Sequence, residues 1–149
     1  MITRYDFATP TYVQAVQLRH RVLREPLQRD INDDPLHEEH DQVHFAAWEG
    51  DLLAGTCTLR RAGTGLQMRQ VAVEPSQRGG GVGRALVRAC EAYAKRAGAS
   101  ALFCHARSVA EAFYKRCGWQ PVGERFEEVG IEHVRMYYPG LGKPTPSGT

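Results

Sequence analysis

The spacing of apolar residues predicts a long amphipathic helix near the middle of the chain. Between Val82 and Ala97 the apolar positions recur at helical intervals, and the charged residues fall between them. The apolar stripe consists of Val82, Leu86, Cys90, Tyr93 and Ala97. Gly98 follows directly and is expected to end the helix, because glycine commonly occupies the position after a helix.

Two shorter helices are expected on either side of this one. Thr9 followed by Pro10 is a typical helix start, and Pro26 is expected to end that helix. Between them, four residues recur at helical spacing: Val13, Val16, His20 and Leu23. For the other helix, Ser108 and Glu111 have the spacing of a capping box, and Gly118 marks the end.

Segments with alternating or continuous apolar residues predict six strands. They are the two halves of Val43–Arg61 joined at Glu49–Asp51, then Leu66–Val73, Ser100–Ala106, Trp119–Glu128 and Ile131–Tyr138. The last two form a hairpin that turns near Val129 and Gly130. The polar, acidic segment Gln28–Gln42 is expected to be a loop with a short helical turn. This order predicts a single α/β (α+β) domain around one sheet, covering residues 1–138, and a flexible tail at 139–149.

Composition restricts the class of protein further. The chain has 149 residues, 42% hydrophobic and 24% charged, which is ordinary for one globular domain. A net charge of +2 is too small for a nucleic-acid-binding protein that neutralises phosphates. The four cysteines form no CxxC pair, so we expect reduced, packed thiols. With no apolar leader and no membrane-length apolar run, the expected location is the cytoplasm, away from membranes.

A glycine cluster at Gly79–Gly83 is the strongest chemical signal in the sequence. It leads from an apolar strand into the long helix, where unobstructed backbone N–H groups and the helix dipole favour an anion, most often a phosphate. Arg78 can add a charge-assisted contact. A plain tight turn would need only one glycine. The P-loop pattern fails because no Lys-Ser/Thr follows, and the dinucleotide pattern GxGxxG fails because its third glycine is absent.

Two motifs resemble those of the GNAT (Gcn5-related) N-acetyltransferase family. The first is Arg78-x-x-Gly81-x-Gly83 after "VAVEP", and the second is "AEAFYKRCGW", at the expected separation. The resemblance covers roughly residues 10–138, and two motifs in the right order are more specific than either alone. The ending "GERFEEVGIEHVRMYY" resembles the ElaA/YjcF-like branch. The resemblance implies a mixed, mostly antiparallel sheet with helices on both faces, in which Leu66–Val73 splays away from the strand that begins at Ala101.

The resemblance also implies acetyl-coenzyme A as co-substrate and assigns residues to it. The glycine turn would bind the pyrophosphate through Arg78, Gly79, Gly80, Gly81, Val82, Gly83 and Arg84. Backbone groups of Val71, Ala72 and Val73 would pair with pantetheine, and one N–H there would polarise the thioester carbonyl. Arg107 stands where the family often has Asn or Gln, so it would contact pantetheine, a cofactor phosphate or an acidic acceptor.

In the family scheme the acceptor amine attacks the thioester directly. Tyr114 corresponds to the tyrosine that hydrogen-bonds or protonates the coenzyme A sulfur, although it also lies on a helical stripe typical of a core. His133 is the candidate base, and an exposed strand histidine is the alternative. Glu74 and Glu128 are further candidates for the base.

The cluster "HEEHDQVH" contains His37, His40 and His44. It lacks a complete zinc-ligand pattern, so no metal is expected, and the loop is instead expected to border the acceptor pocket, with Asp41 and His44 helping to recognise an amine. The predicted function is N-acetyl transfer to a primary amine of a small molecule or peptide. A non-catalytic acyl-coenzyme A sensor or partner module is the alternative. An edge hairpin of this kind can also support a homodimer.

Overall fold

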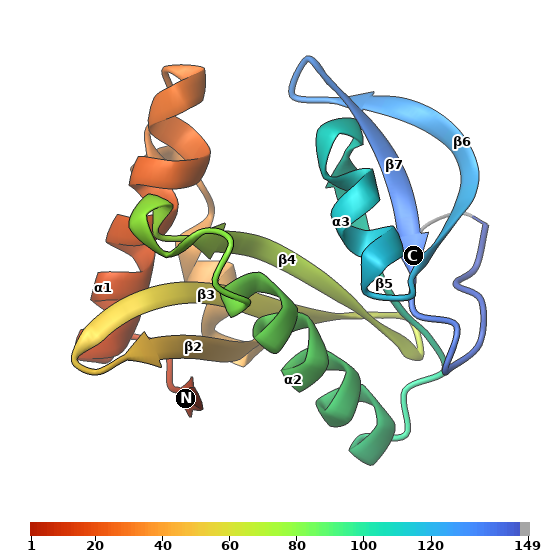
Figure 1. Cartoon of the computed structure of the whole chain (residues 1–149), viewed down its shortest axis with the longest axis horizontal. Helices are drawn as coiled ribbons and strands as arrows, with labels where there is room; N and C mark the ends of the chain where they lie inside the picture. Colours follow the sequence, from red (N-terminus) through yellow and green to blue (C-terminus); the bar gives the residue numbers. More distant parts are fainter. Residues whose placement is uncertain (147–149) are drawn as a thin grey trace. The chain divides into compact units, whose positions relative to one another are not determined.

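Seven strands pair into one sheet in a computed structural model of the chain, which describes residues 1–146. The order across the sheet is β1-β2-β3-β4-β5-β7-β6 (Figure 1). The strands are β1 Ile2–Tyr5, β2 Val43–Glu49, β3 Leu52–Ala62, β4 Gly65–Val73, β5 Leu102–Arg107, β6 Gln120–Glu128 and β7 Ile131–Tyr137. β4 and β5 are parallel, whereas the pairs β1–β2, β2–β3, β5–β7 and β6–β7 are antiparallel. The predicted mixed, mostly antiparallel α/β fold is confirmed.

Three α-helices and several short helical turns connect these strands. The helices are α1 Pro10–Arg19, α2 Val82–Arg96 and α3 Glu111–Arg116. A π-helical turn, His20–Arg24, continues α1, and 3-10 turns form at Glu25–Leu27, Ile31–Asp33, Leu36–Asp41, Pro75–Gln77 and Ser108–Ala110. Thr9 caps α1 as predicted, since its hydroxyl accepts a hydrogen bond from the backbone N–H of Tyr12 at 3.3 Å.

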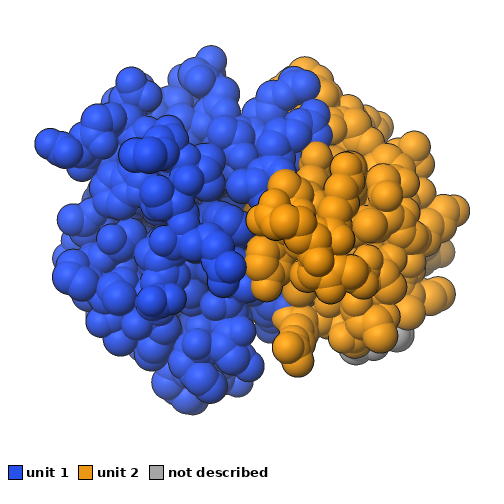
Figure 2. Space-filling view, turned by 90° about the horizontal axis from the view of Figure 1, so that it is seen from below, with its two compact units in different colours: residues 1–60, 70–89 blue, residues 61–69, 90–149 orange. Residues whose placement is uncertain are grey.

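The chain divides into two compact units, which Figure 2 shows in different colours. Unit 1 comprises Met1–Arg60 and Gln70–Ala89, and unit 2 comprises Arg61–Arg69 and Cys90–Thr149. Strands β3 and β4 and helix α2 therefore each contribute residues to both units. No helix among residues 1–146 is long and apolar enough to cross a bilayer.

Unit 1 has an apolar core between α1 and the sheet. Its buried members are Ala15, Leu18, Ala46, Leu53 and Ala72. Gly55 of β3 allows α2 to pack closely, because a Cβ at this position would lie 2.8 Å from Cγ1 of Val82 and 3.1 Å from Cδ1 of Leu86. Any larger residue at position 55 would push the start of α2 away from the sheet.

The buried face of α1 differs from the residues whose spacing predicted the helix. α1 buries Tyr12, Ala15, Leu18 and Arg19, whereas Val13 is 52% exposed. Val16 and His20 are only half-buried. The helix therefore has two apolar faces, of which only one packs against the sheet.

Unit 2 is built around β5, β7 and the residues that follow α3. The indole N–H of Trp119 donates to Oε2 of the buried Glu91 at 2.8 Å, which fixes the chain between α3 and β6. All four cysteines are buried and none forms a disulfide, in agreement with the predicted reduced, packed thiols. Strand β1 was not predicted from the sequence, because its four residues show too little alternation to distinguish a strand from a loop.

The predicted capping box at Ser108 and Glu111 is wrong. No side chain caps α3, and a 3-10 turn precedes it. Ser108 and Glu111 instead both bind Arg125 of β6, whose guanidinium lies 3.3 Å from the Ser108 hydroxyl and 2.6 Å from Oε1 of Glu111. The contacts with Arg125 of β6 therefore occupy the two side chains that were expected to cap the helix.

The described part of the C-terminal segment belongs to unit 2 and is hydrogen-bonded to its strands and loops. Gly142 N–H donates to the carbonyl of Ser100 at 3.0 Å, Arg135 donates to the carbonyl of Thr145, and Pro144 is buried. The flexibility predicted for 139–149 stays a prediction, and residues 147–149 lie outside the described chain.

Candidate functional site

The glycine turn presents exposed backbone N–H groups at the start of α2. Gly79 and Gly81 have φ angles of +82° and +87°, which L-residues with a side chain rarely adopt. The first helical hydrogen bond runs from Ala85 N–H to the carbonyl of Gly81 at 3.0 Å. The N–H groups of the three residues between them thus have no partner within the helix.

The charges around this turn favour an anion. The first turn of α2 contains no acidic residue, so nothing in it opposes the positive end of the helix dipole. Arg78 and Arg84 are exposed beside the turn, and Gly79, Gly80 and Gly81 are exposed with them. This arrangement can bind a phosphate through backbone N–H groups and guanidinium charges together.

Strand β4 changes its pairing just before this turn. It pairs with β5 only from Leu66 to Met68, and the register contains no further pair between these strands within residues 1–146. Gln70 then has a φ of +56°, an irregularity typical of a β-bulge. Its amide is held by Arg24, whose Nη2 donates to Oε1 of Gln70 at 3.2 Å.

After the bulge, the backbone groups of β4 face alternate edges. Glu74 N–H donates to the carbonyl of Ala54 in β3 at 2.8 Å, so the backbone of Ala72, two residues earlier, also faces β3. Val71 and Val73 consequently direct their N–H and C=O groups to the opposite edge. Of the three predicted pantetheine-binding residues, these two have the orientation that adding an extended ligand would require.

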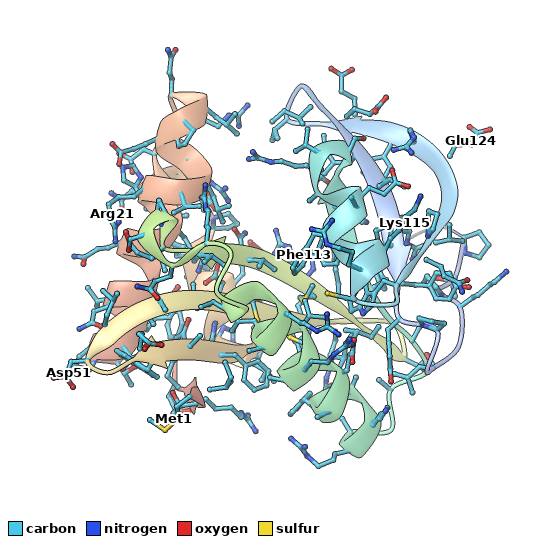
Figure 3. All side chains as sticks on the ribbon, in the orientation of Figure 1. Met1, Arg21, Asp51, Phe113, Lys115 and Glu124 are labelled. Atoms are coloured by element: carbon cyan, nitrogen blue, oxygen red, sulfur yellow. The ribbon has the colours of Figure 1, made fainter. Side chains whose placement is uncertain are left out.

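Tyr114 lies in unit 2, buried at 7% exposure on α3. Its ring packs against Trp119 and Phe113, with centroid distances of 5.5 and 5.0 Å; Phe113 is labelled in Figure 3. The Tyr114 hydroxyl is hydrogen-bonded to the thiol of Cys104 in β5, and burial raises the pKa of that thiol to about 12. The thiol therefore stays neutral and fixes the phenol without adding a charge.

The two ring nitrogens of His133 on β7 have different partners. Nδ1 lies 2.8 Å from the carbonyl of Ile131, which can only accept, so Nδ1 carries a hydrogen. In the neutral ring Nε2 then has a free lone pair, and it lies 3.6 Å from Oε2 of Glu128. The ring is buried and stacks on Phe126 at a centroid distance of 5.8 Å.

Glu128 joins His133 to a second histidine that sequence reasoning missed. Oε1 of Glu128 lies 3.1 Å from Nδ1 of His105 on β5. Two imidazoles thus share one carboxylate, an arrangement that can move a proton away from His133. The register of β5 and β7 places Arg107 opposite His133, so His105, two residues before Arg107, lies on the same face of the sheet as His133. This proximity could not be foreseen from spacing along the sequence.

The other predicted site residues lie in different surroundings. Arg107 is half-buried at the end of β5. Glu74 forms an ion pair with Arg21 at 3.2 Å.

The three loop histidines His37, His40 and His44 lie in different surroundings. No group of three metal-ligating side chains occurs in the part of the chain that the structure describes. His44 is buried, its Nε2 lies 3.0 Å from the carbonyl of Glu39, and its ring stacks on Tyr5 at 5.3 Å. Nδ1 of His40 contacts the carbonyl of His37 at 3.0 Å. Amine recognition by Asp41 or His44 stays a prediction.

A cavity of about 720 Å³ lies between α1 and the segment that follows it, entirely within unit 1. Its apolar wall consists of Tyr12, Val13, Val16, Ile31 and Leu36. The sequence contained a signal for it, since Val13 and Val16 belong to the recurring positions of the first helix. That signal could not distinguish a face lining a cavity from a face packed in a core.

Comparison with known proteins agrees with the fold and the motifs. Residues 8–138 match the sequence model of the acetyltransferase (GNAT) domain. Over 99 residues the chain is 30% identical to the uncharacterised N-acetyltransferase YjcF of Bacillus subtilis (strain 168), covering 66% of this chain and 71% of that protein.

Two solved structures show the same fold. Escherichia coli ElaA has a TM-score of 0.77 and 21% identity, covering 92% of this chain and 98% of its own. An aminoglycoside 6'-N-acetyltransferase complexed with coenzyme A has a TM-score of 0.79 and 17% identity, covering 97% and 99%. With the domain match spanning most of the sequence, the chain belongs to the GNAT acetyltransferase family.

Proposed function

We propose that the protein transfers an acetyl group from acetyl-coenzyme A to a primary amine. The observation that carries this proposal is the exposed glycine turn at the start of α2, with uncompensated N–H groups and two exposed arginines. This is the arrangement a pyrophosphate requires. Family membership supports it, as does the coenzyme A bound to the aminoglycoside 6'-N-acetyltransferase of the same fold.

The proposal assigns cofactor binding to particular groups. Arg78, Gly79, Gly80, Gly81, Val82, Gly83 and Arg84 bind the pyrophosphate. Val71 and Val73 pair with the amides of pantetheine, and Ala72 between them sets their spacing. Arg107 donates to an oxygen of the cofactor, a role suited to a guanidinium because it has donors only.

The reaction proceeds by direct attack of the neutral amine on the thioester carbonyl carbon. A C–N bond forms and the C–S bond breaks, so the sulfur leaves with the electron pair of that bond. Tyr114 donates its phenolic proton to the sulfur, and Nε2 of His133 takes the proton that the amine nitrogen loses. The products are the N-acetylated amine and coenzyme A with a free thiol.

Ligand-dependent thermal unfolding tests cofactor binding. Acetyl-coenzyme A at 100 times its Kd should add about 2.7 kcal/mol of stability and raise Tm, whereas ATP and NAD should leave Tm unchanged. Equal shifts with all three ligands would overturn the proposal. Release of free thiol with a panel of amines tests turnover. If none of the amines leads to thiol release, a binding module is the better description of the protein.

A further inference from the structure

The cavity beside α1 has a polar end and an apolar end. The apolar end is formed by Tyr12, Val13 and Val16 in the first turns of the helix, with Leu36. At the other end the lining residues are the polar His20, Arg21, Asp30 and Asn32 and the apolar Ile31, whose N–H donates to His20. From Val13 to Arg21 the helical rise gives a length of about 12 Å. A small organic molecule of that length would have unlike surroundings at its two ends.

The polar end adjoins the strand assigned to the cofactor. Arg21, labelled in Figure 3, lies at this end and pairs with Glu74 at 3.2 Å. Glu74 directly follows Val73, the last residue of β4. Arg24, one turn later, pairs with Asp34 at 2.6 Å and with Gln70 of β4 at 3.2 Å. A molecule lying in the cavity would therefore have its polar end nearest β4.

The charges at this end favour a cation. Both terminal nitrogens of Arg21 donate to Glu74, so its charge is neutralised locally. Asp30 remains, with its side chain 55% exposed, 3.9 Å from Nδ1 of His20. That nitrogen accepts the N–H of Ile31 at 3.2 Å and so has no proton to offer Asp30 in this geometry. An ammonium group would be attracted here and a carboxylate repelled.

Resting on the proposed acetyl transfer, we propose that the acceptor is a primary amine attached to an aromatic or branched apolar body. The body lies on Val13, Val16 and Leu36, and the nitrogen lies at the Asp30 end of the cavity, next to β4. The volume of about 720 Å³ is within the range of small-molecule sites. The apolar wall disfavours polyhydroxylated amines, and Asp30 disfavours amino acids with a free carboxylate.

Three matched amines test the substrate class with the intact protein. 2-Phenylethylamine has the expected body, ethanolamine lacks the ring, and phenylalanine adds a carboxylate. Thiol release from acetyl-coenzyme A should have a kcat/KM at least tenfold higher with 2-phenylethylamine than with either of the others. Equal or higher values for ethanolamine or phenylalanine would overturn the inference.

Variants test the place of binding. Val13→Asn changes an exposed cavity residue, and Gln14→Asn is the matched control on a face that does not line the cavity. Asp30→Asn removes the charge but keeps an oxygen for the N–H of Asn32, with exposed Asp33→Asn as control. The cavity variants should raise KM for 2-phenylethylamine about tenfold without changing KM for acetyl-coenzyme A, whereas the controls should change neither. Unchanged KM in both cavity variants would overturn the inference.

Failure of the inference can be told from failure of the proposed function. If acetyl-coenzyme A raises Tm and only polar amines are acetylated, the inference fails and the proposed function stands. If acetyl-coenzyme A does not bind, the proposed function fails. Calorimetric titration with 2-phenylethylamine alone then decides about the cavity: binding that Val13→Asn weakens supports it, and no binding overturns it.

Discussion

Arg19 and Glu39 form a buried, two-point ion pair that joins α1 to the acidic segment after it. Nη1 and Nη2 of Arg19 lie 2.8 and 2.7 Å from the two carboxylate oxygens of Glu39, and the Arg19 side chain has no exposed surface. The hydroxyl of Tyr12 donates to the same carboxylate at 2.9 Å. Burial opposes ionisation of Glu39, but the hydrogen bonds and charge of Arg19 outweigh it and lower its pKa.

Breaking this pair should destabilise the protein strongly. Glu39→Gln leaves the buried guanidinium of Arg19 without a compensating charge, so the free energy of unfolding should fall by about 3 kcal/mol. Urea denaturation at pH 7 measures it. Glu38→Gln, an exposed change to the neighbouring residue, should cost less than about 0.5 kcal/mol. Equal losses in the two variants would show that Arg19 does not depend on this pair.

Stability should depend on pH through two buried groups, Glu39 and the neighbouring His44 of β2. Burial lowers the pKa of His44, so the folded state keeps the ring neutral while the unfolded state takes up a proton near pH 6.5. The unfolded state binds more protons below that pH, and the free energy of unfolding should fall as pH falls from about 6.5. Glu39 has the same sign, since its lowered pKa makes stability decrease further as pH falls below about 4.3.

His44→Gln isolates the histidine contribution. Glutamine keeps an N–H for the carbonyl of Glu39 but does not titrate, so the slope of stability between pH 6.5 and 5 should become shallower. The maximum contribution of one proton is about 1.4 kcal/mol per pH unit. The exposed His37→Gln variant should keep the wild-type slope. If His44→Gln also keeps it, His44 is not the group that titrates.

Gly81 should be required for cofactor binding beyond its effect on the backbone. Asparagine tolerates positive φ better than other residues with a side chain, so Gly81→Asn should keep the turn but place atoms where the pyrophosphate binds. We expect Kd for acetyl-coenzyme A to rise at least tenfold by calorimetry. Gly50→Asn, at φ +59° in the β2–β3 turn, is the matched control and should leave Kd unchanged. Equal affinity in both variants would remove the glycine turn from the cofactor site.

Local signals allowed much of the fold to be predicted. The β2–β3 and β6–β7 hairpins and the limits of α2 follow from short-range patterns, and the structure confirms them. β1 was not predicted because its stability comes from pairing with β2 and not from its own sequence. The pairing runs from Ile2 opposite Ala47 to Tyr5 opposite His44. The capping box failed because Arg125, 14 residues from Glu111, competes for the same side chain.

Some parts of the candidate site could likewise be predicted from the sequence, and others could not. The glycine turn is a continuous stretch of sequence, so its anion-binding character could be predicted from its residues alone. The link from His105 through Glu128 to His133 depends on sheet register, and the cavity depends on how Ile31 and Leu36 fold back over α1. Both are products of tertiary structure that no spacing along the chain encodes.

Tyr114→Phe should separate proton donation from binding. It removes the proposed donor to the sulfur while keeping the ring packed on Trp119, so kcat should fall about 10² fold and Kd for acetyl-coenzyme A should stay close to that of the wild type. The change also removes the hydrogen bond to Cys104, so Cys104→Ala is the control for that contact. Loss of kcat in Tyr114→Phe alone supports proton donation by the phenol. Normal turnover in this variant would remove Tyr114 from the mechanism.

His133→Asn should remove the base while keeping its anchoring hydrogen bond. The asparagine amide N–H occupies a position similar to Nδ1 and can still donate to the carbonyl of Ile131, but it provides no counterpart of the Nε2 lone pair. We expect kcat to fall 10² to 10⁴ fold at pH 7. Activity should recover partly at high pH, where more of the acceptor amine is already neutral. The adjacent, exposed Glu132→Gln should leave the pH–rate profile unchanged. A His133→Asn enzyme whose profile matches that of the wild type would show that the amine loses its proton to another group or to water.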